Sequence, residues 1–156
     1  MDQWLGTMRA NPVVLIAEDN EDTRRVYGMI LRHFGYEVEE VTNGLDAVDA
    51  ARARRPSLVL MDIGLPGLDG WQASQVLKAD PATANIPLIA FSARVDSTAD
   101  LGRKATFDGY ILKPISPNEL VRRVDAYLTL LGVPHPHAHA HPIDRPASDP
   151  PQELAG

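Results

Sequence analysis

The 156-residue sequence contains no cysteine, few aromatic residues and no long apolar run. Without cysteine there can be no disulfide bonds, thiolate zinc sites or cysteine nucleophiles, so any bound metal must use oxygen or imidazole ligands. No stretch approaches the roughly 20 apolar residues of a membrane-spanning helix, and the first eleven residues lack the pattern of a signal peptide. These absences favour a soluble, cytoplasmic protein that makes no membrane contact.

Positive charge is also scarce, because 15 Lys and Arg residues stand against 21 Asp and Glu residues, for a formal net charge of −6. A negative protein is not attracted to nucleic acid or anionic lipid, so direct DNA binding is not expected. The length and the 44% hydrophobic content suit one well-packed domain.

Short apolar runs alternate with helical patterns along the chain. Four runs are typical of buried strands, at residues 13–17, 58–61, 88–91 and 110–112, and residues 36–41 alternate apolar and acidic side chains as an edge strand does. This alternation predicts an α/β fold with a doubly wound, five-stranded parallel sheet. Ligands of such sheets bind beyond the carboxyl ends of the strands.

Apolar spacing places the helices and their buried faces. Val26, Ile30 and Phe34 recur at helical spacing in the first helix, and an apolar stripe marks the last one, at Leu120, Val124, Tyr127, Leu128 and Leu131. The segment 94–106 has few apolar residues and contains a glycine, so it is expected to be the most mobile helix.

The chain divides into three parts: an N-terminal extension (1–11), a folded domain (12–131) and a tail (132–156). The tail holds six of the 13 prolines and four of the five histidines, at positions 135, 137, 139 and 141. With almost nothing to bury, it is expected to be disordered and solvated.

Polar side chains follow the ends of four predicted strands. Glu18 and Asp19 follow the first strand and Asp62 follows the third, so three carboxylates should share one pocket, which favours a hard cation such as Mg²⁺. Ser92 and Lys113 end the fourth and fifth strands, where both could reach a phosphate. Each alone could be a cap, a turn former or a solvated side chain, but their joint placement indicates a site.

Four segments carry a resemblance to a known family: 16–20 (IAEDN), 60–70 (LMDIGLPGLDG), 91–93 (FSA) and 108–115 (DGYILKPI). They closely resemble the receiver domains of two-component response regulators, over about residues 12–131. The resemblance implies a CheY-like fold with strand order 2-1-3-4-5, and a signalling switch in place of a conventional enzyme.

The same resemblance implies a role for each residue of the pocket. Asp62 matches the phosphoacceptor and, with Asp19 and the carbonyl of Gly64, a direct ligand of Mg²⁺, while Glu18 acts on the metal mostly through water. Ser92 matches the hydroxyl that binds the phosphoryl group, and Lys113 matches its counter-ion. Two further matches are Tyr110, whose rotamer follows Ser92, and a cis peptide bond between Lys113 and Pro114.

The family also implies partners and a cycle of phosphorylation and hydrolysis. The donor is a phosphohistidine on a sensor histidine kinase or on a phosphotransfer protein, and the output is a contact with an unknown downstream protein or a homodimer. Both outputs would use the face of the fourth helix, the fifth strand and the last helix. Gly64 and Arg94 flank the expected path of the hydrolytic water, and Gly64 has no side chain to orient it, so slow self-dephosphorylation is expected.

Several alternatives stay open. A single-domain response regulator is favoured because no further domain follows Leu131, although a receiver module cut from a hybrid kinase is possible. An aspartyl phosphatase is disfavoured because Gly64 stands where such enzymes place a second Asp. The tail histidines could instead chelate Zn²⁺ or Ni²⁺. Finally, the family usually has Gly at the position of Thr106, which leaves the geometry near the fourth helix open.

Overall fold

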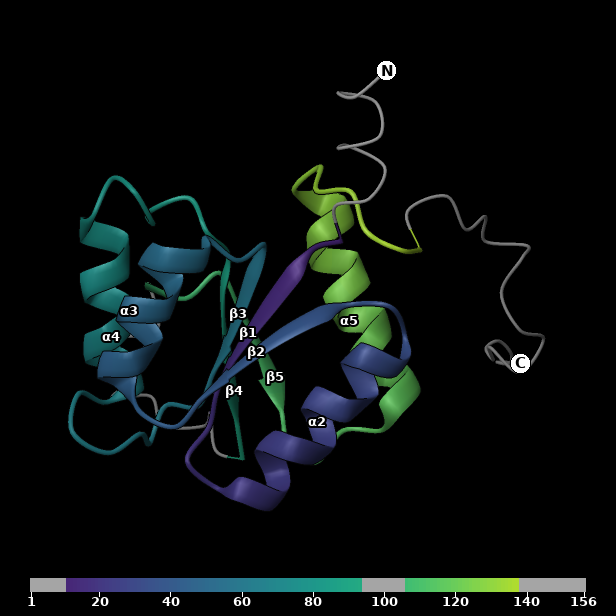
Figure 1. The fold of residues 1–156 in the computed structure, drawn as a ribbon, viewed down its shortest axis with the longest axis horizontal. Coiled ribbons are helices and arrows are strands. Elements are labelled where there is room, and N and C mark those ends of the chain that lie inside the picture. The colour runs from purple at the N-terminus through teal and green to yellow at the C-terminus, as the bar shows by residue number, and fades with distance from the viewer. Residues whose placement is uncertain (1–10, 94–105, 138–156) are drawn as a thin grey trace, which may run out of the picture.

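The computed structural model describes residues 11–93 and 106–137, which form a layered α/β domain (Figure 1). The five strands are β1 (Val13–Ala17), β2 (Glu37–Val41), β3 (Leu58–Met61), β4 (Leu88–Ser92) and β5 (Gly109–Leu112). The described helices are α2 (Glu21–His33), α3 (Gly44–Arg54), α4 (Gly70–Ala79) and α5 (Pro117–Leu130).

The strands form one parallel sheet in the order β2-β1-β3-β4-β5, which confirms the predicted topology. Helices α2 and α5 cover one face of the sheet, and α3 and α4 cover the other (Figure 1). Strands β1, β3 and β4 lie inside the sheet and are almost completely buried. Their continuous apolar runs follow from this burial on both faces.

Each described helix begins at a residue whose side chain accepts a backbone N–H of the first turn. These N-caps are Asn20, Asn43, Asp69 and Ser116. Asp69 also forms a capping box, because Gln72 returns a hydrogen bond to its backbone N–H. Such caps fix where a helix starts, so the loops between the strand ends and the helices are held at a defined length.

The buried face of α2 agrees with the prediction only in part. Ile30 and Phe34 are partly buried and pack against the core cluster of α2 and α5, as their spacing predicts, whereas Val26 is 49% exposed. Tyr27 and Leu31, which the spacing did not single out, are buried in the core.

The expected burial at the end of the chain also needs correction at three residues. Leu112, predicted within a buried strand, is 56% exposed because β5 is an edge strand. On α5, Val121 is buried in place of Leu131, which is 52% exposed because it follows the last helical turn.

Residues that follow α5 contact the core of the domain. Val133 packs against the core cluster of α2 and α5, and His135 is buried. The expectation of a solvated tail from residue 132 therefore does not hold for Val133, His135 and His137, which are at least partly buried, whereas Gly132, Pro134 and Pro136 are exposed. Residues 138–156 lie outside the described part.

The edge strand β2 is lined by ion pairs. Glu37 and Glu39 both face Arg54, at 3.6 and 2.6 Å, and Glu40 pairs with Arg24 and Arg32 of α2, at 3.3 and 2.7 Å. The predicted edge position of this strand is confirmed. Among the described helices, none is long and apolar enough to cross a membrane.

Candidate functional site

Three carboxylates meet at the carboxyl ends of the two central strands. Strands β1 and β3 pair directly, with Ala17 opposite Met61, so the residues that follow them are neighbours. One carboxylate oxygen from each of Glu18, Asp19 and Asp62 lies within 4.8 Å of the other two. The structure thus brings together the three acids that the sequence places after different strands.

Lys113 reaches this pocket from the edge strand β5. It follows β5, and its side chain crosses β4, with Nζ 5.3 Å from the centre of the Phe91 ring. The ammonium contacts Oε1 of Glu18 and lies 3.7 Å from Oδ2 of Asp62. One cation therefore faces two of the three carboxylates, in a place where only 14% of its side chain is exposed.

Glu18 is the buried member of the acidic group, with 2% of its surface exposed. Burial raises the pKa of its carboxyl, and the neighbouring charge of Asp62 adds to this rise. Hydrogen bonds from Lys113 and from the backbone N–H of Asn20, 3.1 Å away, lower the pKa but offset only part of the rise. The pocket therefore holds a carboxylate that gains from any added positive charge.

Two further sequence-predicted residues lie at this end of the sheet. The backbone N–H of Gly64 donates to Oδ1 of Asp62 at 3.2 Å, which orients the carboxylate. Ser92 is buried at the end of β4, where its carbonyl oxygen accepts the backbone N–H of Lys113 at 2.9 Å. The peptide bond between Lys113 and Pro114 is cis.

Tyr110 is half-buried on β5, where its ring lies 6.2 Å from that of Phe107. Phe107 in turn packs edge-on against the buried Trp71. Arg123 of α5 donates to the carbonyl oxygen of Tyr110 at 2.5 Å. The sequence analysis did not anticipate this link between the strand and the last helix.

The segment expected to form the fourth helix, 94–105, lies outside the described residues, and so does Arg94. Thr106, at its end, is described, and its hydroxyl hydrogen-bonds with the hydroxyl of the buried Ser74 on α4. A glycine could not make this bond, so Thr106 ties the chain before β5 to α4.

Arg24 is a supporting residue that the sequence analysis missed. Its guanidinium donates to the carbonyl oxygen of Glu18 at 3.2 Å and also contacts Glu40 of β2. It thereby holds the backbone that carries the acidic pair. Its position one turn into the helix that follows Asp19 is the only signal that could have suggested this role.

Gly70 packs directly against the backbone of Asp62, the phosphoacceptor candidate. A Cβ atom at Gly70 would lie 2.3 Å from the carbonyl oxygen of Asp62 and 2.8 Å from Cα of Ile63.

We expect Gly70→Ala to lower the free energy of unfolding by about 2–3 kcal/mol, because backbone must move to admit the methyl group. Urea unfolding would measure this loss. The matched control is Gly64→Ala, since a Cβ at exposed Gly64 meets nothing within 4 Å, and a similar loss in both variants would contradict the prediction.

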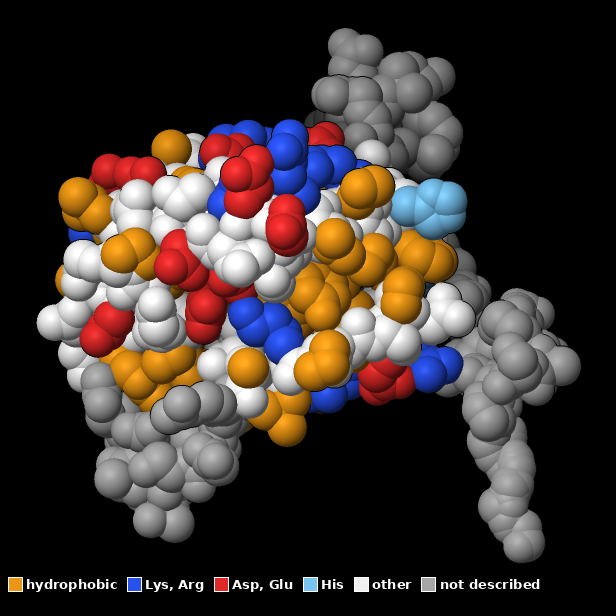
Figure 2. Space-filling model, turned by 90° about the horizontal axis from the view of Figure 1, so that it is seen from below, with side chains coloured by type: hydrophobic (Ala, Val, Ile, Leu, Met, Phe, Trp, Pro, Cys, Tyr) orange, Lys and Arg blue, Asp and Glu red, His pale blue; other side chains and the backbone are white. Residues whose placement is uncertain are grey.

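An apolar groove lies on the outer face of α2, lined by Val26, Met29, Ile30, His33, Phe34 and Pro117. Pro117 begins α5 shortly after Lys113, and α2 begins directly after the acidic pair. Figure 2 views the molecule from the carboxyl ends of the strands and shows apolar side chains gathered beside acidic ones on this face. The groove therefore lies between the outer face of α2 and the start of α5.

A parallel sheet in this order, with carboxylates and a lysine at the carboxyl ends of its strands, defines a CheY-like α/β domain. Residues 14–125 match the response regulator receiver domain family. Because this match spans more than half of the chain, the protein belongs to that family.

Two response regulators that are similar in sequence agree with this assignment. The polar-differentiation response regulator DivK of Brucella anthropi is 37% identical over 116 residues, which cover 74% of this chain and 94% of DivK. The DNA-binding response regulator MtrA of Mycobacterium tuberculosis is 36% identical over 126 residues, which cover 80% of this chain and 53% of MtrA. This chain thus spans about half the length of the MtrA proteins it matches.

A solved structure gives a further comparison. The receiver domain of the sensor histidine kinase PA1611 from Pseudomonas aeruginosa superposes with a TM-score of 0.71 at 32% identity, over 76% of this chain and 98% of that one. That structure holds a magnesium ion coordinated in its active site cleft.

Proposed function

We propose that this protein accepts a phosphoryl group on Asp62 from a phosphohistidine of a sensor kinase or a phosphotransfer protein. The observation that carries the proposal is the pocket itself, in which a partly exposed carboxylate stands beside two other acids and one buried lysine. Membership of the receiver family supports the same function.

The chemistry follows from the positions of the side chains. An oxygen of Asp62 forms a bond to phosphorus while the bond from phosphorus to the donor imidazole nitrogen breaks. The transition state has little covalent character, so alignment and neutralisation of charge matter most. Lys113, already 3.7 Å from Asp62, would neutralise charge on the transferred group, and the hydroxyl of Ser92 would donate to one of its oxygens.

Asp19 and Asp62, with Glu18 behind them, fit a magnesium ion, because several carboxylate oxygens converge at an open edge of the sheet. Bound there, the ion would orient the phosphoryl oxygens and offset their negative charge. The carbonyl of Gly64 is the proposed further ligand from this chain.

The apolar groove on α2 is the proposed docking surface for the phosphohistidine donor. The donor must bring its imidazole to the acidic pocket, and α2, which carries the groove, begins directly after the acidic pair. Exposed Val26 and Met29 offer the kind of area that a partner helix would bury.

The output is proposed to pass through Ser92 and Tyr110 to the surface of β5 and α5, where a downstream protein or a second copy of the chain would bind. Because Arg123 holds the carbonyl of Tyr110, a movement of that strand would be transmitted to α5. On α5, the charged side chains of Glu119 and Arg122 pair with each other at 2.7 Å.

Phosphoryl uptake by the full chain tests this function. The protein is incubated with acetyl phosphate and, separately, with a phosphorylated histidine kinase, in Mg²⁺ or in excess chelator. We expect one phosphoryl group per chain that is labile in acid and in base, formed only with Mg²⁺ and located at Asp62 by peptide mass spectrometry after borohydride reduction. No uptake from either donor, or a label on another residue, would refute the proposal.

Hydrolysis of the aspartyl phosphate tests the role of Gly64. This residue is exposed, with no atom within 4 Å of a Cβ placed on it, so an asparagine fits without strain. We expect Gly64→Asn to shorten the half-life of the phosphorylated protein roughly tenfold, because the amide can orient the attacking water. The measurement is loss of the phosphoryl group after removal of the donor. Gly64→Ala serves as the control and should keep the half-life of the wild type.

A further inference from the structure

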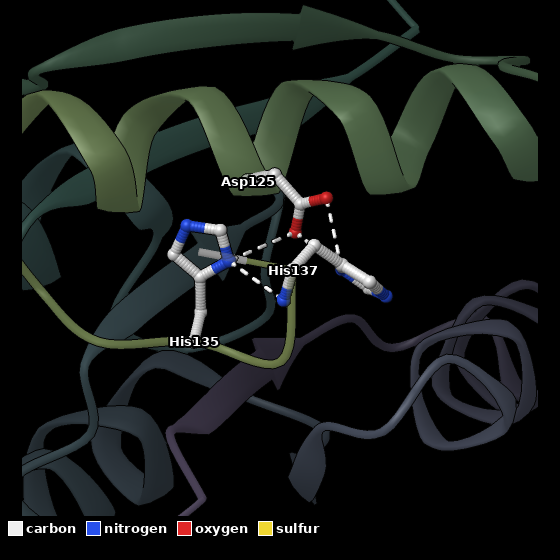
Figure 3. A group of neighbouring side chains, drawn as sticks. All are labelled: Asp125, His135 and His137. Carbon is white, nitrogen blue, oxygen red and sulfur yellow. Dashed lines mark hydrogen bonds and ion pairs between the residues drawn. The ribbon is translucent and has the colours of Figure 1, made fainter. Parts of the chain in front are cut away.

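A second group of metal-ligating side chains lies far from the acidic pocket. It comprises Asp125 of α5 and two histidines of the C-terminal segment, His135 and His137 (Figure 3). Their ligand atoms all lie within 4.8 Å of one another. Tyr36, which contacts Asp125, directly precedes β2, so this group lies toward the amino ends of the strands, at the opposite end of the sheet from Asp62.

We propose that Asp125, His135 and His137 bind a divalent transition-metal ion such as Zn²⁺ and thereby fasten the C-terminal segment to the receiver domain. Two imidazoles and one carboxylate suit such an ion, which binds nitrogen and oxygen ligands and keeps its remaining positions for water. The proposal does not depend on the phosphoryl chemistry of Asp62.

The distances suit a shared ion. Nδ1 of His137 lies 2.9 Å from Oδ2 of Asp125, and Nδ1 of His135 lies 3.6 Å from Oδ1. Ligands of a tetrahedral zinc ion, with bonds of about 2.0–2.1 Å, are about 3.3 Å apart. Only small movements of the side chains would therefore bring all three to bonding distance.

Hydrogen bonds already select the form of His135 that can bind a metal. Its Nδ1 accepts the backbone N–H of His137 at a long 3.3 Å, so the ring proton is on Nε2, which donates to the hydroxyl of Thr129 at 2.8 Å. In this form Nδ1 carries the lone pair that a metal ion needs, and the atom lies 3.6 Å from Oδ1 of Asp125. Partners of this kind on the second ring nitrogen commonly fix metal-binding histidines.

The carboxylate of Asp125 is held in the same way. It accepts the hydroxyl of Tyr36, whose pKa is raised by burial and by the carboxylate itself, so the phenol stays a donor. Nδ1 of His137 is a further partner of Asp125. A neutral imidazole binds a metal through one ring nitrogen and keeps its proton on the other, so Nδ1 of His137 would bind the ion with the ring proton on Nε2.

The backbone of the segment is also packed in place. A Cβ built on Gly35 would lie 3.2 Å from the side chain of Pro136, and the His137 ring lies 6.3 and 6.1 Å from the rings of Phe34 and Tyr36. Pro136, which lies against Gly35, therefore stands between the two histidines and holds their backbone in place. A bound ion would join this segment, α5 and the turn before β2.

Zinc titration of the full chain, monitored by calorimetry and by thermal unfolding, tests the site. Excess Mg²⁺ keeps the carboxylates around Asp62 from competing. We expect one Zn²⁺ per chain and a rise in Tm of roughly 5–10 °C when free zinc exceeds its Kd about 100-fold. No change in Tm at saturating zinc would overturn the proposal, because an ion held only by a solvated tail does not stabilise the fold.

Variants separate this site from simple chelation by a histidine-rich tail. Asp125→Asn keeps an acceptor for the hydroxyl of Tyr36 but removes the carboxylate ligand, so we expect it to lower zinc affinity at least tenfold. His137→Ala should lower zinc affinity by a similar factor. Tyr36→Phe removes the hydrogen bond that holds Asp125 and should weaken zinc binding by about 10–100-fold. The matched control, His139→Ala with His141→Ala, should retain the ion and the rise in Tm. Unchanged binding in Asp125→Asn together with loss in the control would overturn the proposal. X-ray absorption of the zinc complex should show two imidazoles, and four would also overturn it.

Discussion

The Asp62→Asn variant is expected to take up no phosphoryl group and, in chelator, to unfold at a higher temperature than the wild type. Loss of uptake follows because a neutral amide is not a nucleophile toward phosphorus at neutral pH. The gain in stability follows because Asp62 shares its pocket with Glu18 and Asp19, and removing one charge relieves repulsion. At these separations we expect about 1 kcal/mol, or roughly 3–5 °C in Tm.

Magnesium should reverse this order of stability. An ion bound to the folded wild type would stabilise it by mass action, whereas the variant lacks one of the proposed ligands. Differential scanning calorimetry in chelator and in excess Mg²⁺ would measure both effects. A variant that is less stable than the wild type in both conditions would contradict the repulsion argument, and residual labelling at full stoichiometry would contradict the assignment of Asp62.

The Lys113→Met variant is expected to lose about 2–3 kcal/mol of the free energy of unfolding at neutral pH and to accept phosphate about 10²–10³ times more slowly. The stability loss arises because the buried carboxylate of Glu18 loses its cation. The loss in rate arises because the charge facing Asp62 is removed. Urea unfolding and the initial rate of labelling from acetyl phosphate measure the two effects separately.

The stability loss should depend on pH in a defined direction. The pKa of Glu18 in the folded protein lies above its ordinary value of 4.5, and removing Lys113 raises it further. A protonated Glu18 therefore favours the folded state, and this contribution is complete below pH 4.5 and is lost as the pH rises through the folded pKa. The deficit of Lys113→Met should be small near pH 4.5 and full at neutral pH. Glu18→Gln combined with Lys113→Met should recover most of it, and a deficit that does not vary with pH would contradict this origin.

The sequence was sufficient to predict the sheet and the members of the acidic pocket. Continuous apolar runs mark buried parallel strands, and the acids, the hydroxyl and the lysine follow those runs directly. Helix α2 was harder, because apolar residues line two of its faces. Spacing alone cannot tell whether Tyr27 or Val26 faces the sheet, and only packing against α5 and the strands decides it.

The C-terminal segment shows a second limit of prediction from sequence. Prolines and histidines give residues 132–137 the composition of a solvated tail, yet His135 is buried. His135 contacts Thr129 and Asp125 of α5, and Asp125 in turn accepts a hydrogen bond from Tyr36, which is about a hundred positions earlier in the chain than His135. Local composition carries no information about partners so distant in sequence.

The row of ion pairs on β2 also bears on how the protein behaves at high concentration. An edge strand offers unpaired backbone groups to which another extended chain can add, and this is a common first step of aggregation. Here Glu37 and Glu39 are held by Arg54, and Glu40 by Arg24 and Arg32, so the edge carries charges of both signs along its five residues. An incoming strand would have to strip water from these charges, and the edge is thereby protected against unwanted sheet extension.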